Sequence, residues 1–112
     1  MEVIIKGHKY KMSEKGSNEH QLIQFYQDGK INNSSTITGV TNQEVLRVLI
    51  DRVQFLDKQL PSKYNDEILL CLRKALVLHE CRALERKVEK GLIYPEKIEI
   101  TTDAHFSLTK KI

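Results

Sequence analysis

The fold is decided by residues 41–65, which read TNQEVLRVLIDRVQFLDKQLPSKYN. The stretch opens with a capping box, in which the Thr41 hydroxyl and the Glu44 carboxylate satisfy free N–H groups at a helix start. Apolar residues then recur at helical spacing, which predicts an amphipathic helix. Pro61 ends this helix, because proline lacks an N–H and restricts the residue before it. The apolar positions are Val45, Leu46, Leu49, Val53, Leu56 and Leu60.

A second helix is predicted directly after the first. Ser62 suits its N-terminal cap, and the next glycine or proline is Gly91, which suits its C-terminal cap. Two long helices joined by about three residues must fold back on each other, so residues 41–91 predict an antiparallel helical hairpin. The apolar positions of the second helix are Ile68, Leu69, Leu72, Ala75, Leu76, Leu78 and Leu84.

Residues 1–40 have the character of strands. A tight turn at Gly7-His8 separates two β-like segments and predicts a hairpin, and Asp28-Gly29 is a strong turn signal after a further strand. The expected strands are residues 2–6, 9–12 and 21–27, with a short one at 36–38.

Two short alternating segments, residues 97–101 and 106–108, follow the helices. They predict either a small β-hairpin or a tail that docks on the N-terminal strands. The whole is expected to be an α+β fold in three parts: an N-terminal antiparallel β-unit (1–40), the helical hairpin (41–91) and a C-terminal tail of short strands (92–112).

The composition is that of an ordinary globular chain. The 112 residues are 40% hydrophobic and 29% charged, and 18 basic against 15 acidic side chains give a formal charge of +3. So mild a charge does not require DNA or RNA as a partner. No run approaches the roughly 18 apolar residues of a membrane span, so no membrane partner is expected.

Cys71 and Cys81 lie ten residues apart in the second helix. That spacing separates them by about 15 Å along the axis, too far for a disulfide within the chain. We expect them to be reduced thiols in the core.

No catalytic signature is visible. The chain has no glycine-rich phosphate loop, no HExxH, no CxxC and no nucleophile elbow. The acidic pair Asp66-Glu67 is explained by the dipole of the second helix. We therefore expect no enzyme, no metal site and no cofactor. The four histidines lie on separate elements: His8, His20, His79 and His105.

One stripe of the second helix combines apolar and charged residues. Arg82 and Arg86, four residues apart, are neighbours on one face, and paired arginines can hold a phosphate or pyrophosphate through forked hydrogen bonds. The simpler interpretation is a solvated basic helix end, paired with Glu85 or Glu89. The stripe is Asn65, Ile68, Leu72, Ala75, His79, Arg82 and Arg86.

Phe55, off the main stripe of the first helix, is the second candidate site residue. An aromatic ring there could stack on a purine base, and the simpler interpretation is a packing residue.

The hairpin as a whole resembles the Thoeris anti-defence sponges, a phage family that shares this hairpin with the phage proteins that counter cyclic-nucleotide (CBASS) immunity. The resemblance covers residues 41–91 and 3–10. The chain departs from the family pattern at Tyr64, at Ala83 and after Gly91. The resemblance rests on the entry TNQEV (41–45), the helix VLRVLIDRVQFLDKQL (45–60), the turn PSKYN (61–65), the ending Arg82, Arg86, Lys90, Gly91, and the segment VIIKGHKY (3–10).

The resemblance implies a non-enzymatic sponge in the cytoplasm of the infected host cell. Such proteins bind cyclic ADP-ribose isomers, the signal of a TIR-domain enzyme, and sequester them intact, so that the Thoeris effector stays off. The implied ligand contacts are Phe55 for stacking, Asn65 for polar recognition, and Arg82 with Arg86 for phosphates. The alternatives are a sponge for cyclic di- or trinucleotides of CBASS immunity and a small protein–protein adaptor.

Spacing alone places a condition on that site. Asn65 and Arg82 are 17 residues apart on one helix, about 25 Å, so one nucleotide-sized ligand cannot bridge them. Phe55 and Asn65 both flank the hairpin tip, where they can lie close together. A pocket lined by all four residues therefore needs the tip of one subunit and the arginines of another, in a homodimer or a larger homo-oligomer.

Overall fold

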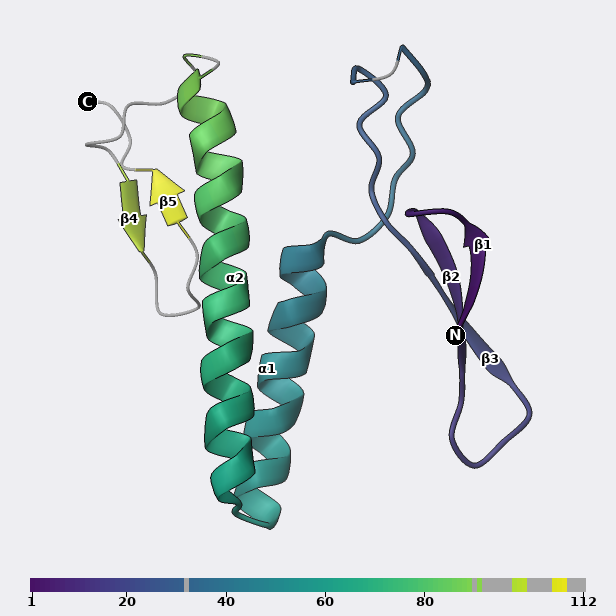
Figure 1. Ribbon diagram of the computed structural model, residues 1–112, viewed down its shortest axis with the longest axis vertical. Helices are drawn as coiled ribbons and strands as arrows, with labels where there is room; N and C mark the ends of the chain where they lie inside the picture. The colour runs from purple at the N-terminus through teal and green to yellow at the C-terminus, as the bar shows by residue number, and fades with distance from the viewer. Residues whose placement is uncertain (32, 90, 92–97, 101–105, 109–112) are drawn as a thin grey trace. The chain divides into compact units, whose positions relative to one another are not determined.

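The computed structural model describes residues 1–31, 33–89, 91, 98–100 and 106–108, and they form two compact units, Met1–Asn42 and Gln43–Ile112. Three antiparallel N-terminal strands precede two helices, which confirms the expected α+β fold (Figure 1). Each unit is described by itself below. Within the described part of the chain, neither helix is both long enough and apolar enough to cross a membrane.

The first unit is built on a three-stranded sheet of order β1-β2-β3. β1 (Glu2–Ile5) and β2 (Lys9–Ser13) form the expected hairpin, and β3 (His20–Gln24) pairs antiparallel with β2. Gly7 takes a φ of 81°, which only glycine adopts readily, and this allows the tight turn between β1 and β2. The register aligns Val3, Tyr10 and Ile23 on one face of the sheet.

Beyond β3 the expected strands at 21–27 and 36–38 are only partly present. β3 ends at Gln24, and two isolated bridges follow it. Phe25 pairs with Val40 in the parallel sense, whereas Gln27 pairs with Ile37 in the antiparallel sense. One returning segment cannot extend a parallel and an antiparallel ladder at once, so neither bridge grows into a strand.

In the second unit, α1 (Asn42–Gln59) and α2 (Lys63–Glu89) run antiparallel from a tight turn, which confirms the helical hairpin (Figure 1). α1 begins directly after Thr41 and ends before Pro61. The Ser62 hydroxyl accepts a hydrogen bond from the Tyr64 N–H (3.2 Å) and so caps α2. Gly91 has a φ of 68°, the left-handed conformation expected after a helix end.

Apolar residues of the hairpin are divided between a buried and an open side. Among the described residues, the buried hydrophobic side chains are Leu69 and Leu76 of α2. Val53 of α1 is half-buried, whereas Leu49 and Leu56 of the same expected stripe are exposed. The apolar residues of α1 span a wider arc than α2 covers, so part of the apolar surface of α1 is left open. Further exposed apolar residues of the hairpin are Val48, Phe55, Leu60, Tyr64, Ile68, Leu70 and Leu78.

The cysteines differ from expectation. Cys71 and Cys81 are free thiols, but both are exposed, so the prediction that they lie in the core was wrong. Both cysteines lie on a different side of α2 from the buried Leu69 and Leu76. Helical spacing alone did not say which side of α2 is covered.

Two short strands follow the hairpin. β4 (Ile98–Ile100) and β5 (Phe106–Leu108) pair antiparallel, with Ile98 opposite Leu108, and β5 lies beside α2 (Figure 1). The described parts of the expected segments, residues 98–100 and 106–108, therefore pair with each other. The remaining residues of the tail, with His105 among them, lie outside the described residues, as does Lys90.

Candidate functional site

The two helices of the hairpin differ in length, and this difference shapes the site. α2 has 27 residues and α1 has 18, so α2 is nine residues longer, about 14 Å. Since both start from one turn, the last turns of α2 extend past the beginning of α1 (Figure 1). Arg82 and Arg86 belong to this extension, and both are exposed.

The two arginines of the extension have glutamates as neighbours in the sequence. Among the residues that the structure describes, neither Arg82 nor Arg86 forms an ion pair, and Glu85 and Glu89 are exposed beside them. Exposed arginines without an ion pair also fit the simpler interpretation of a solvated basic helix end. Two neighbouring guanidinium groups can hold a phosphate or pyrophosphate through forked hydrogen bonds.

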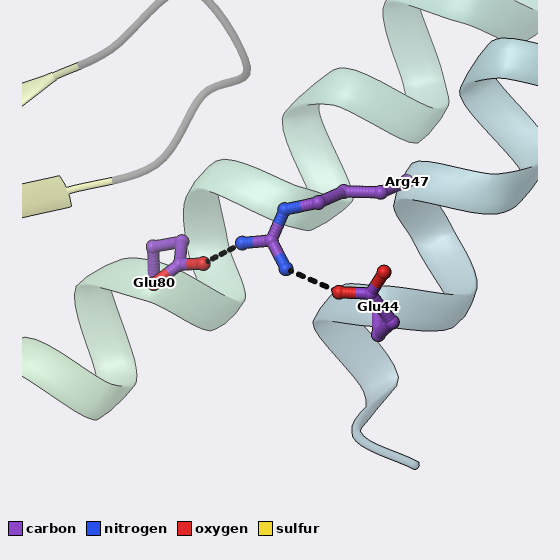
Figure 2. A network of polar contacts seen from close by, with 3 residues as sticks. All are labelled: Glu44, Arg47 and Glu80. Carbon is purple, nitrogen blue, oxygen red and sulfur yellow. Dashed lines mark hydrogen bonds and ion pairs between the residues drawn. The ribbon is translucent and has the colours of Figure 1, made fainter.

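Glu80, the acidic residue nearest in sequence to Arg82, is engaged elsewhere. Figure 2 shows the Arg47 guanidinium of α1 bridging the carboxylates of Glu80 and Glu44. The Arg47 and Glu80 side chains are largely buried, with 18% and 11% exposed. This contact ties Glu80 to α1 and directs its charge away from the arginine end. Only the local pair of Arg47 and Glu44 has a spacing that can be recognised in the sequence, so the contact with Glu80 could not be predicted.

An open pocket of about 280 Å³ adjoins the arginine end of α2. Its lining is mostly apolar and, within the described residues, consists of Ala75, Leu78, His79 and Arg82. Three of these belong to the stripe singled out from the sequence, and Leu78 was missed as a site residue. A mostly apolar, open pocket with an arginine among its lining residues suits a ligand that is part apolar and part anionic.

At the other end of the hairpin, Asn65 is held in place by a carboxylate. Its Nδ2 donates to Asp57 Oδ1 (3.0 Å), and the same oxygen accepts the Ser62 backbone N–H (3.1 Å). Asn65 and Asp57 are both half-buried. Asn65 was expected from the sequence, whereas the contact with Asp57 depends on how the two helices meet.

Phe55 points away from this group. It is 55% exposed and precedes Asp57 by two residues, which is about 200° around the helix. Because Asp57 faces α2, the Phe55 ring is on the opposite side of α1. Within one chain the structure therefore brings together neither Phe55 with Asn65 nor the tip with the arginines. It does bring Arg82 together with Ala75 and His79.

No group of three His, Cys, Asp or Glu side chains is placed to hold a metal ion in the described ranges. Comparison of the chain with protein-family models, with curated proteins and with solved structures gives no match.

Proposed function

We propose that this protein is a non-enzymatic phage anti-defence sponge that binds a cyclic ADP-ribose-type immune signal and keeps it from the Thoeris effector. The observation that carries the proposal is the exposed pair Arg82 and Arg86 on the extension of α2, beside an apolar pocket. Binding alone suffices for this function, because a sequestered signal need not be chemically changed.

The arginine end suits the pyrophosphate of such a ligand. Arg82 lines the pocket, and Arg86 is its neighbour one turn further along α2. Each guanidinium presents parallel N–H groups that match two phosphate oxygens. The apolar floor at Ala75 and Leu78 would lie against a sugar or base, where removal of water strengthens the charged hydrogen bonds.

The hairpin tip suits the base. Asn65 offers the base an amide in a fixed position. The Phe55 ring is exposed and open for stacking, but on the opposite side of α1, so within one chain the two side chains do not hold the same base. Since the tip and the arginines lie about 25 Å apart along α2, both act on one ligand only if they come from different copies. An antiparallel pairing of two hairpins would set the tip of one beside the arginines of the other, in two equal pockets.

The open apolar residues of the hairpin support this pairing. Leu70 and Leu78 of α2 are 62% and 59% exposed, and α1 presents Leu49 and Leu56 to solvent. Large apolar side chains that a hairpin leaves uncovered are typical of a surface that a partner buries. A second copy is the partner that would also complete the ligand pocket.

The test is calorimetric titration of the protein with cyclic ADP-ribose isomers, followed by heat release and chromatography of the ligand. We expect tight, reversible binding and recovery of unchanged ligand. Arg82→Ala and Arg86→Ala should each weaken binding, by about 10-fold or more for a charged hydrogen bond. Arg73→Ala is the matched control, because Arg73 is an exposed arginine of α2 outside the stripe.

The outcomes separate the alternatives. Failure of every isomer to bind would exclude this function. Preferential binding of cyclic di- or trinucleotides in competition would indicate a CBASS sponge with the same hairpin. A protein that binds no nucleotide but forms a defined complex through Leu70 and Leu78 would be an adaptor, and a changed ligand after release would reveal an enzyme.

A further inference from the structure

At the hairpin tip, a side chain of α1 forms hydrogen bonds with the start of α2. One oxygen of Asp57, near the end of α1, accepts two hydrogen bonds from the start of α2. One donor is the backbone N–H of Ser62 (3.1 Å), the capping residue, and the other is the side-chain amide of Asn65 (3.0 Å). The Asn65 N–H also donates to the Ser62 carbonyl (3.0 Å), so the first turn of α2 is fixed on both sides.

This geometry decides which way the Asn65 amide faces. An ionised carboxylate only accepts hydrogen bonds, so it must meet the Nδ2 of the amide and repels the carbonyl Oδ1. A flipped amide would place two acceptors in contact and lose one hydrogen bond. Oδ1 is therefore directed away from Asp57, and it remains available as an acceptor.

We propose that Asp57 is a positioning residue that turns the carbonyl of Asn65 outward, so that the tip selects a ligand carrying a hydrogen-bond donor, such as the 6-amino group of adenine. This inference rests on the proposed function for the identity of the ligand. Its structural half, the orientation of Asn65 by Asp57, concerns the free protein and is tested without any ligand.

The negative charge of Asp57 also favours one orientation of the bound ligand. A half-buried carboxylate beside Asn65 repels a phosphate at the tip, whereas Arg82 and Arg86 attract it at the other end of α2. The neutral, donor-bearing end of the ligand is therefore assigned to the tip and the anionic end to the arginines. Asp57 thus decides which group of the Asn65 amide faces the ligand, and it decides that the neutral end of the ligand binds at the tip.

The structural half is tested by nuclear magnetic resonance of the free protein. In the wild type, one Nδ2 proton of Asn65 should resonate downfield and exchange slowly with water. In Asp57→Ala both changes should be lost, while the amide spectrum of α2 beyond the first turn stays that of the wild type. Asp57→Asn, which can still accept through its oxygen, should keep most of the effect. An Asn65 side chain that is unaltered in Asp57→Ala overturns the inference.

The functional half is tested by a double-mutant cycle with a cyclic ADP-ribose isomer as the probe. Asp57→Ala should weaken binding about 5- to 10-fold in the wild-type background and not further in Asn65→Ala. Equal losses in both backgrounds would show that Asp57 acts independently of Asn65 and would overturn the inference. Asp51→Asn, an exposed aspartate of the same helix, is the matched control and should bind as the wild type.

The choice of donor is tested with the ligand itself. An analogue of the same cyclic isomer whose purine lacks the 6-amino group should bind wild-type protein about 5- to 10-fold more weakly. Asn65→Ala should bind both ligands alike. An analogue bound as tightly as the parent by the wild type would overturn the assignment of the donor. Absence of binding by every isomer would instead refute the proposed function and leave the resonance test decisive for Asp57.

Discussion

Arg47 of α1 and Glu80 of α2 form an ion pair across the helical hairpin, although they are 33 residues apart in the sequence. The contact lies near the beginning of α1 and joins it to the turn of α2 that contains Glu80. Glu80 lies two residues before Arg82, so the contact is close to the point where the extension of α2 begins. One pair of charged side chains thus joins the two helices next to the candidate phosphate site.

Removing either partner of this ion pair should destabilise the hairpin. Each of Arg47→Ala and Glu80→Ala removes a largely buried charged contact between the helices, at a cost of about 2 kcal/mol in the free energy of unfolding. Urea unfolding at fixed protein concentration measures the loss, since association would make stability depend on concentration. The double variant should lose less than the sum of the single variants. Strict additivity would show that the pair is not coupled.

Glu44→Gln serves as the control for that series, because glutamine can keep the cap at the start of α1 and loses only the charge. Glu44 is the more exposed of the two acidic partners of Arg47, with 62% of its side chain open to solvent. Exposed ion pairs contribute little, so the variant should lose less than about 1 kcal/mol. A loss as large as that of Glu80→Ala would mean that the local pair, and not the contact between helices, carries the stability.

The arginines of α2 should not be replaceable by lysine. Arg82→Lys and Arg86→Lys keep the charge but replace a planar fork by a single ammonium group. We expect each to weaken binding of a cyclic ADP-ribose isomer by about 10-fold, measured by calorimetry. Lys87→Arg, an exposed change on the same turns, should leave affinity unchanged. Full affinity in the lysine variants would indicate attraction by charge without forked hydrogen bonds.

Charged residues on the open face of α1 should prevent self-association. Leu49→Glu and Leu56→Glu place a carboxylate on a surface that the hairpin does not cover, so the helices should persist in circular dichroism. Sedimentation velocity should show the wild type as a dimer or larger and the variants as monomers, with ligand affinity lost together with association. Lys58→Glu, at another exposed position of α1, is the control. A monomeric wild type that binds ligand would contradict the shared pocket.

The turn at Gly29 should be intolerant of any side chain. Gly29 is buried, its N–H donates to Thr36 Oγ1 (3.2 Å), and its carbonyl accepts the Ser34 N–H (2.8 Å). A Cβ at this position would collide with the Ser34 carbonyl oxygen and with the backbone of the next two residues. Gly29→Ala should therefore lose about 2 kcal/mol or more of stability in thermal unfolding, as expected for overpacking. Ser34→Ala, which keeps the backbone contacts, should be close to neutral, and a neutral Gly29→Ala would contradict the close approach.

The sequence by itself determined where the helices begin and end. The residues that cap or end the helices act on backbone groups within one turn of their own positions, so their effect is independent of the rest of the chain. They are Thr41, Pro61, Ser62 and Gly91. The β1–β2 hairpin is local in the same sense, since Gly7 supplies the conformation that its turn requires. The greater length of α2, and with it the extension that carries Arg82 and Arg86, follows directly from these local stops.

Only the tertiary structure decided which side chains meet. Asp57 contacts Asn65, and Arg47 contacts Glu80, because of the register and rotation of α1 against α2. The same rotation turns Phe55 away from Asn65 and leaves Cys71 exposed. Register and rotation depend on the summed packing of many weak contacts, and an apolar stripe wider than one helix face permits several solutions. The sequence thus set the ends of the hairpin, and packing between its helices set the orientation of the residues at its candidate site.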